Sequence, residues 1–361
     1  MKLKSYEVLS VRQKQFSELS LDDSFFDSLK EDYPGFENWF LRKSKETAFI
    51  VENKGIQGFL YMKIEGEDED YSKFTVPLEP KKRLKIGTFK ITMKGHYLGE
   101  RFFRIILEHA IMNRVEEVYV TIFSKRDEQK LLINFMRDFG FRLQTTDKKT
   151  NEQVFVREME KIITSETSLK NYPYIEESTK RKYFMLSIDT IYHTKLIPDS
   201  IIREENPKDF TSNIVAANAI QKTYIGNYMI SPRPGDIIVY YRTKPSFDER
   251  PAKYSAVLTG FGVVSDNHKG VHSYDRVIEI VSKRTVLTDK EIKEKLKTKR
   301  RVNILKFIDI YSFKYRPIRK FLLEQNILKS VTDYPTKEIS SEEFDMILKQ
   351  ARFNKNNIFI N

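Results

Sequence analysis

The sequence predicts an α+β chain of two domains: an N-terminal mixed sheet flanked by helices, followed by a small β-barrel with helices. Residues 84–141 follow the order strand, glycine loop, helix, strand, helix, which is typical of a layered α/β unit. A polar stretch rich in Ser, Thr and Pro, residues 158–182, separates the two halves. The second half alternates many short apolar runs with few helical patterns, which favours a barrel.

The first elements are predicted from apolar spacing and turn residues. We expect strands at 7–11, 47–52 and 56–64, and helices at 23–33 and 36–45. Asn53-Lys54-Gly55 separates two of these strands and has the composition of a hairpin turn.

The run from Leu84 to Phe141 contains the clearest pattern in the chain. Apolar residues without helical period predict a strand at 84–91, and a second strand is predicted at 118–122. Between them, Phe102 to Ile111 place apolar side chains on one wide helix face. A second helix, beginning near Leu131, ends at Gly140, and a further strand is expected at 153–157.

The second half is expected to contain strands at 183–188, 237–241, 256–264, 277–282 and 303–311. Helices are expected at 213–223, 290–298 and 344–351, the first capped by Asn213. Ser231-Pro232-Arg233-Pro234-Gly235-Asp236 predicts a rigid turn, since proline fixes φ. Gly260 and Gly262 predict a bulge or a close backbone approach in their strand.

These elements give domains at 1–160 and 181–335, joined by a linker at 161–180 and followed by a helical tail at 336–361.

Composition narrows the classes of function. The chain of 361 residues has no cysteine, which excludes thiol catalysis and thiolate metal sites, and its five histidines are scattered, so we expect no metal. No apolar run approaches the ~20 residues of a membrane span, and residues 1–7 lack the apolar core of a secretory signal. We expect a cytoplasmic protein without membrane contact. A net charge of +12 favours acidic partners or merely indicates a lysine-rich surface.

The loop from Lys94 to Gly99 is a candidate anion site. A strand that feeds a glycine loop and then a helix N-terminus directs backbone amides and the positive end of the helix dipole at a ligand. The sequence Lys94-Gly95-His96-Tyr97-Leu98-Gly99 therefore suggests a phosphate-bearing ligand.

Over residues 1–160 the chain resembles the GNAT-type N-acetyltransferases. The loop is similar to the family's Arg/Gln-x-x-Gly-x-Gly/Ala motif, and Leu131 to Phe141 is similar to its aromatic helix ending in Gly-Phe. The resemblance implies acetyl-CoA as cosubstrate, its pyrophosphate held by amides from about His96 to Arg101. The implied cofactor-binding residues are Ile91, Lys94, Gly95, His96, Tyr97, Leu98, Gly99, Glu100, Arg101 and Gln129. Tyr97 replaces the family's middle glycine, which narrows the approach to the backbone.

Met136 stands where the family's tyrosine donates a proton to the departing thiolate, and methionine cannot donate. Three explanations remain open. Another hydroxyl, from Ser124, Tyr97 or Tyr119, acts instead; solvent suffices; or the domain binds CoA without turnover. Ser124 is our candidate for the catalytic hydroxyl.

Transfer to an amine also requires a group that removes its proton. Glu65, at the end of its strand, is the candidate base, and His96 is an alternative whose loop position favours phosphate contact. The acidic run 65–70 is either a solvated loop or a recruiting surface for a cationic acceptor such as a protein lysine or a polyamine.

The second half resembles the PUA-like superfamily, in particular its ASCH and EVE relatives. The resemblance is carried by residues 218–224, by Arg233-Pro234-Gly235-Asp236 with the strand after it, and by residues 260–264. It implies binding of RNA or of modified bases in DNA. The residues from Val281 to Lys320 suit that role, because 14 Lys or Arg face only four acids there. Our candidate nucleic-acid contacts are Arg233, Tyr241, Arg242, Arg300, Arg301 and Tyr315.

Two hypotheses follow. In the first, an acetyl-CoA-dependent N-acyltransferase is tethered to a nucleic-acid-binding module, and an acceptor amine attacks the thioester directly. In the second, a catalytically degenerate first domain belongs to a nucleic-acid-binding regulator.

Overall fold

The computed structural model describes residues 11–164, 166–200, 214–246 and 248–360. The chain divides into two units, the first ending at Lys161 and the second beginning at Ile162. Each is described by itself. The strand expected at 7–11 lies outside the described residues except for Val11, which is not in a strand.

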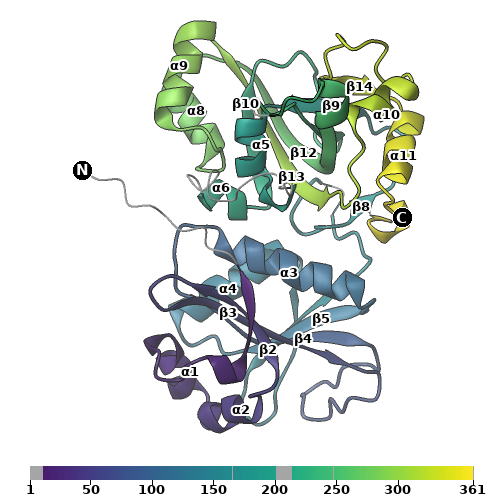
Figure 1. The fold of residues 1–361 in the computed structure, drawn as a ribbon. Coiled ribbons are helices and arrows are strands. Elements are labelled where there is room, and N and C mark those ends of the chain that lie inside the picture. The colour runs from purple at the N-terminus through teal and green to yellow at the C-terminus, as the bar shows by residue number, and fades with distance from the viewer. Residues whose placement is uncertain (1–10, 165, 201–213, 247, 361) are drawn as a thin grey trace. The chain divides into compact units, whose positions relative to one another are not determined.

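The first unit is built on a seven-stranded sheet in the order β1-β2-β3-β4-β5-β7-β6 (Figure 1). Its strands are β1 (Arg12–Gln15), β2 (Thr47–Glu52), β3 (Ile56–Glu65), β4 (Arg83–Ile91), β5 (Glu117–Ile122), β6 (Arg142–Thr146) and β7 (Gln153–Glu158). β4 and β5 are parallel and the other neighbouring pairs are antiparallel, so the sheet is mixed as predicted.

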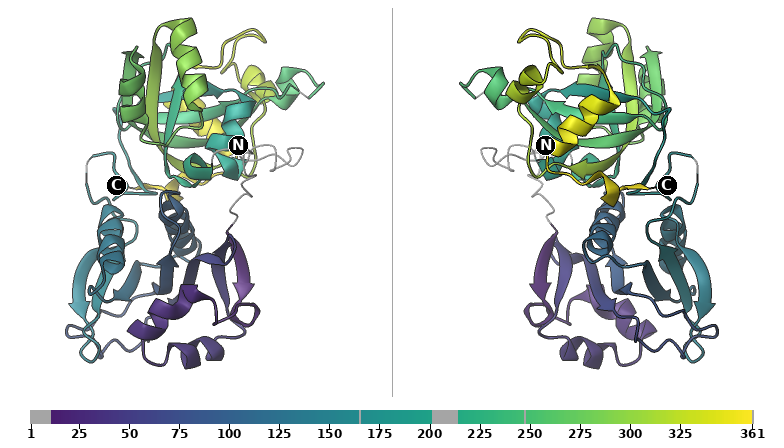
Figure 2. Two further views of the ribbon diagram at one scale, coloured as in Figure 1. Left: turned by 90° about the vertical axis from the view of Figure 1, so that its left-hand side faces the viewer. Right: turned by 90° about the vertical axis from the view of Figure 1, so that its right-hand side faces the viewer.

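Helices cover both faces of this sheet (Figure 2). They are α1 (Asp27–Asp32), α2 (Phe36–Arg42), α3 (Leu98–Met112) and α4 (Asp127–Asp138). One face packs an aromatic cluster in which Phe26 and Phe40, from the α1 and α2 region, contact Phe59 of β3. On the opposite face Phe103 of α3 contacts the ring of Phe135 in α4. The helices α1 and α2 are therefore separated from α3 and α4 by the sheet.

The parallel strands β4 and β5 diverge. Their pairing begins at Arg83↔Glu117 and ends at Ile86↔Val120, although β4 continues to Ile91. On its other edge β4 stays paired with β3 as far as Gly58↔Ile91. Beyond Ile86, β4 is therefore paired with β3 on one edge and has no described strand partner on the edge that faces β5. The sheet opens at this edge.

The second unit contains a six-stranded sheet in the order β10-β13-β12-β11-β9-β14. Its strands are β9 (Tyr183–Ile188), β10 (Gln221–Gly226), β11 (Ile237–Arg242), β12 (Val257–Val271), β13 (Val302–Ser312) and β14 (Lys337–Ile339). The α+β class is confirmed. No pairing joins β10 to β14 within the described residues, so the closed barrel stays a prediction.

Gly260 and Gly262 lie where backbone and rings come close, as predicted. A Cβ at Gly260 would stand 2.2 Å from the carbonyl oxygen of Tyr311, and one at Gly262 would stand 2.2 Å from the hydroxyl of Tyr240. The register between β12 and β13 shifts between Phe261 and Gly262. These glycines let β13 and the buried Tyr240 pack directly on β12.

The second unit has more helices than the sequence indicated. They are α5 (Thr190–Leu196), α6 (Ile214–Asn218), α7 (Ala252–Ser255), α8 (Tyr274–Val281), α9 (Asp289–Lys299), α10 (Arg319–Glu324) and α11 (Ser341–Gln350). The strand predicted at 277–282 was wrong, because residues 277–281 belong to α8 and Ser282 is the C-cap of that helix. The hydroxyl of Ser273 caps this helix, and it buries Val277, Ile280 and Val281 on one face.

The helix predicted at 213–223 is shorter than expected. Asn213 lies outside the described residues, α6 ends at Asn218, and Gln221–Gly226 pairs with β13 as a strand. The buried Lys222 joins the start of β10 to the end of α6, because its ammonium donates to the carbonyls of Ala216 and Ala217.

The segments 162–180 and 336–360 both contribute to the second unit. The strand β8 (Ile175–Glu176) pairs in parallel with β15 (Phe359–Ile360). Tyr172 and Tyr174 are buried, and Tyr183 stacks on Phe344 of α11. Among the residues that the structure describes, no helix combines the length and apolar character needed to cross a membrane.

Candidate functional site

A cavity of about 1160 Å³ lies in the first unit where β4 and β5 diverge. Tyr33 and Trp39 line it from the α1 and α2 side of the sheet. Leu132 and Met136 line it from α4, on the opposite side. The lining of the cavity therefore includes residues from helices on both faces of the sheet.

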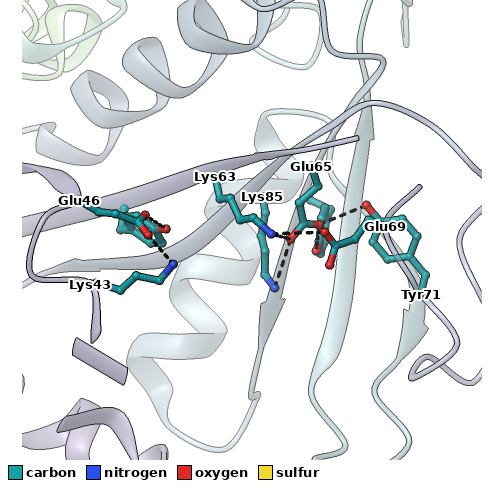
Figure 3. A network of polar contacts seen from close by, with 9 residues as sticks. Lys43, Glu46, Lys63, Glu65, Glu69, Tyr71 and Lys85 are labelled. Atoms are coloured by element: carbon teal, nitrogen blue, oxygen red, sulfur yellow. Dashed lines mark hydrogen bonds and ion pairs between the residues drawn. The ribbon is translucent and has the colours of Figure 1, made fainter. Parts of the chain in front are cut away.

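Glu65 provides a buried carboxylate in this cavity (Figure 3). The residue is 3 % exposed. Its Oε2 accepts hydrogen bonds from the hydroxyls of Tyr119, at 2.5 Å, and Tyr71, at 3.2 Å. Two phenols therefore fix one carboxylate oxygen and leave Oε1 to face the cations of the cavity.

Two lysines approach Oε1 of Glu65 without reaching hydrogen-bond distance. The Nζ of Lys63 lies 3.6 Å from it and that of Lys85 lies 3.8 Å away (Figure 3). Lys63 also donates to Glu69 at 3.3 Å. Burial lowers the pKa of Lys85, because desolvation disfavours its charged form. Both lysines line the cavity, so the amine of a bound substrate would approach the same Glu65 oxygen that the two ammonium groups face.

The two phenols stay protonated at neutral pH. Burial raises the pKa of Tyr71 to about 12, and burial together with the hydrogen bond to Glu65 raises the pKa of Tyr119. Tyr119 was one of the hydroxyls proposed to protonate a leaving thiolate. Its proton is directed at Glu65, so in this structure it positions the carboxylate.

The loop before α3 is exposed where the sequence predicted an anion site. Lys94 and Gly95 are exposed, and a Cβ at Gly95, which has φ +76°, would meet no heavy atom within 4 Å. Ile91 ends β4, and Tyr97, the N-cap residue before α3, adopts a left-handed conformation with φ 49°. The Tyr97 side chain makes no capping hydrogen bond to the first helical turn among the described residues.

Other residues predicted for the cofactor have structural contacts. Leu98 and Glu100 are buried in α3, and a Cβ at Gly99 would lie 3.2 Å from the ring of Phe135. Gly99 thus permits α3 and α4 to pack closely. His96 and Arg101 are half-buried at the same helix start.

The side chain of Gln129 caps the start of α4. Its Oε1 accepts from the backbone amides of Lys125 and Arg126, both at 3.0 Å, and its Nε2 donates to Asp32 at 2.9 Å. A contact between Gln129 and a cofactor would have to replace this cap.

The hydroxyl proposed for catalysis, Ser124, is exposed just after β5 and is not among the residues that line the cavity. Met136 is fully buried and does line it. The position of the missing tyrosine therefore lies within the site, and the structure brings Glu65, but not Ser124, to that place.

Sequence reasoning missed Tyr61, Lys63 and Lys85 of this cavity. The available signal was the presence of charged residues inside otherwise apolar strands: Lys63 precedes Glu65 on β3 and Lys85 interrupts β4. Charged side chains within sheet strands are rarely buried unless they are paired.

The nucleic-acid residues predicted in the second unit divide by exposure. Arg233, Arg300 and Arg301 are exposed, and Tyr315 is 45 % exposed with the guanidinium of Arg352 4.3 Å from its ring centroid. Two others are buried: Tyr241 is 2 % exposed, with its hydroxyl accepting from Arg319, and Arg242 is 1 % exposed. These two strand residues cannot reach a polynucleotide without rearrangement of β11.

His193 is a buried titratable group in the second unit. Its Nε2 lies 2.7 Å from the hydroxyl of Thr259, and its Nδ1 has no hydrogen-bond partner among the described residues. Burial, together with the nearby charges of Arg242 and Arg316, lowers its pKa to about 3. The imidazole is therefore neutral in the folded state at neutral pH.

This histidine predicts acid sensitivity of the second unit. Its folded pKa of about 3 is below the ordinary value of about 6.5, so between these values the unfolded chain binds one more proton. Stability from His193 is therefore complete above about pH 6.5 and falls as the pH decreases. Between pH 7 and pH 5 the unfolding free energy of the parent chain should fall because of His193. We expect this fall to be about 2 kcal/mol smaller in the His193→Gln variant.

Urea unfolding followed by circular dichroism measures this difference, while fluorescence of the single tryptophan, Trp39, reports separately on the first unit. His272→Gln is the control, because His272 is exposed. An unchanged pH dependence in His193→Gln would contradict the assignment.

No protein-family model matches the chain, and no curated protein matches it. Solved structures resemble parts of it at low identity. An ASCH protein from Zymomonas mobilis is 13 % identical with a TM-score of 0.31, covering 47 % of this chain and 96 % of its own. A NatC complex bound to Gag peptide and CoA is 14 % identical with a TM-score of 0.28, covering 41 % and 98 %. A GNAT-family acetyltransferase from Listeria monocytogenes is 10 % identical with a TM-score of 0.26, covering 41 % and 95 %.

Proposed function

We propose that the first unit is an acetyl-CoA-dependent N-acyltransferase in which an acceptor amine attacks the thioester directly. The observation that carries this proposal is the cavity at the divergence of β4 and β5, which is lined by residues from helices on both faces of the sheet. It gives a thioester arriving from the α3–α4 face and an amine arriving from the α1–α2 face a common meeting point.

The fit to acetyl-CoA rests on two features of the chain. The open loop at Lys94 and Gly95 precedes α3, where amides and the helix dipole favour a diphosphate. The β5-facing edge of Gly87–Ile91 has backbone groups without a strand partner, and a pantetheine arm carries amides that suit such an edge.

In this proposal acetyl-CoA supplies an acetyl group on a thioester. Glu65 removes the proton of the acceptor amine through Oε1, the oxygen that faces the cavity lysines. Tyr119 and Tyr71 hold the carboxylate in position through Oε2. Met136 cannot protonate the leaving sulfur, so the thiolate departs with the help of solvent.

Calorimetry with acetyl-CoA tests the binding step. We expect the Thr121→Phe variant to weaken binding by about tenfold, or about 1.4 kcal/mol, because the phenyl ring would occupy space in the cavity that the thioester needs. Thr121 lines the cavity on β5, just beyond the last residue paired with β4. Thr47→Phe is the control, because Thr47 is exposed on β2. Absence of heat at high acetyl-CoA concentration would remove the transferase proposal.

The buried Met136 favours a second candidate, a first unit that binds CoA without turnover. A thiol-release assay with a lysine peptide, spermidine and RNA as acceptors separates the two. Calorimetric binding without any thiol release would support the degenerate domain and the regulatory role proposed with it.

We propose further that the second unit binds single-stranded nucleic acid through the end of α9. Lys297, Lys299, Arg300 and Arg301 are all exposed there. The acceptor of the acetyl group would then be RNA itself, modified DNA, or a protein bound to either nucleic acid. The basic segment supplies phosphate contacts, whose strength depends on salt.

Charge reversal tests this surface. We expect Arg300→Glu/Arg301→Glu to weaken RNA binding and to reduce the slope of log K against log salt by about 0.7 for each phosphate that the variant no longer neutralises. Fluorescence anisotropy with a labelled single strand at several salt concentrations gives the slope. Lys45→Glu/Lys54→Glu changes net charge equally at exposed positions of the first unit. Equal losses of affinity in both variants would indicate non-specific attraction.

A further inference from the structure

Lys85 occupies the base of the opening between β4 and β5. It precedes Ile86, the last β4 residue that pairs with β5, and its side chain belongs to the cavity lining. In register it stands opposite Tyr119 on β5 and Lys63 on β3. An amine of the chain itself is therefore placed where the sheet opens.

The ammonium group of Lys85 is loosely held. Its nearest carboxylate atom is Oε1 of Glu65 at 3.8 Å, and it donates no hydrogen bond to any described residue. Its other close neighbour is the ring of Tyr119, 5.6 Å from Nζ to the centroid. Lys63 differs, since it donates to Glu69 and its side chain is 47 % exposed.

Lys90 provides an internal comparison on the same strand. Burial lowers its pKa, as it does for Lys85. Its ammonium, however, donates to the carbonyl of Phe25 and to the hydroxyl of Ser28, and Lys90 does not line the cavity. Lys85 and Lys90 therefore lie on the same strand and are both half-buried. Of the two, only Lys85 lines the cavity, and only Lys90 donates hydrogen bonds to described residues.

We propose that Lys85 is an internal acyl acceptor, acetylated by a thioester bound at the divergence of β4 and β5. This inference rests on the proposed function, because it uses the same cavity and the same carboxylate.

The acetyl transfer needs only Lys85, Glu65, the bound thioester and solvent. The neutral amine of Lys85 attacks the thioester carbonyl, its C–N bond forms, and the C–S bond breaks. Oε1 of Glu65 accepts the proton lost from nitrogen, and the sulfur leaves as thiolate and takes up a proton from solvent. An amine tethered beside the site reacts as though at high local concentration.

The test is peptide mass spectrometry of the full chain after incubation with acetyl-CoA, and in parallel with the acetyl thioester of N-acetylcysteamine, which lacks the nucleotide. We expect an acetyl group on Lys85 and none on Lys90. Its formation should be lost in urea and in the Lys85→Arg variant, while Lys45→Arg, at an exposed position outside the cavity, leaves it unchanged.

Each outcome decides the inference. Modification of Lys85 over Lys90 with either donor supports it. Equal modification of both lysines, or modification confined to exposed lysines, overturns it, and so does an unmodified Lys85 with both donors. Calorimetry of acetyl-CoA judges the proposed function separately, so binding without Lys85 modification rejects only the internal acceptor.

Discussion

The Glu65→Gln variant is expected to transfer acetyl groups about 10²- to 10⁴-fold more slowly than the parent chain, because loss of a general base costs that much in rate. Acetyl-CoA binding should be retained, since the substitution keeps size and shape. The amide oxygen of glutamine still accepts from Tyr119 and Tyr71, which now hold Oε2 of the carboxylate. What the amide loses is the ability to take a proton.

The measurement is thiol release with spermidine or a lysine peptide, run beside acetyl-CoA calorimetry on the same preparation. Glu69→Gln is the matched control, because Glu69 lines the same cavity and contacts Lys63 but has no hydrogen bond to either phenol. Equal rates in the parent and Glu65→Gln would show that the amine loses its proton elsewhere. Equal losses of rate in both variants would indicate a general electrostatic effect of the cavity.

Strands bounded by clear turn residues were predictable from the sequence. The predicted bounds of β2 (Thr47–Glu52) and β9 (Tyr183–Ile188) are those of the structure. In both, apolar residues run between polar or turn-forming neighbours, so local pattern and tertiary environment agree. The bulge at Gly260 and Gly262 was predictable for a similar reason, because a glycine pair inside an apolar strand has few other uses.

The error at α8 has a different cause. Val277, Ile278, Ile280 and Val281 are β-branched and favour strands by propensity. The fold buries only one side of this segment, and Ile278 is 37 % exposed while Val277 is fully buried. Tertiary packing and the Ser273 cap therefore decide in favour of a helix, and neither is visible in local composition.

The candidate site also depends on tertiary contacts that local sequence does not reveal. Glu65 could be singled out because it ends a strand, and it lies in the cavity. Lys85 could not, because its place depends on the register of β3 against β4, which shifts between Tyr61 and Met62. Gly99 appeared to be a phosphate-loop glycine, whereas its contact with Phe135 depends on how α4 packs against α3. Side-chain partners distant in sequence determine each of these roles.

Removal of one member of the buried pair Arg83–Glu117 is expected to destabilise the first unit strongly. The pair joins β4 and β5 at the first residues of their pairing, at the end opposite the opening. Arg83 is 1 % exposed, and its Nε and a terminal nitrogen each lie 2.8 Å from Oε2 of Glu117. Lys81 contacts the other oxygen at 2.5 Å, and the guanidinium lies over the ring of Tyr71.

Breaking this pair would leave a buried charge without its partner. Arg83→Met and Glu117→Gln are each expected to cost about 3–5 kcal/mol of unfolding free energy, as removal of one member of a buried ion pair generally does. The double variant should cost less than the sum of the two, because no charge is then stranded. Lys14→Met is the control, since its ion pair with Glu52 is more exposed and should contribute at most about 1 kcal/mol.

Urea unfolding followed by Trp39 fluorescence measures these values, because the only tryptophan lies in the aromatic cluster of the first unit. Additive losses of stability would mean that the two residues act separately. A loss below about 1 kcal/mol in Arg83→Met would mean that the ion pair does not hold the strands together. The result also bears on the site, because the ion pair lies at one end of the β4–β5 pairing and the cavity lies at the other end, beyond Ile86.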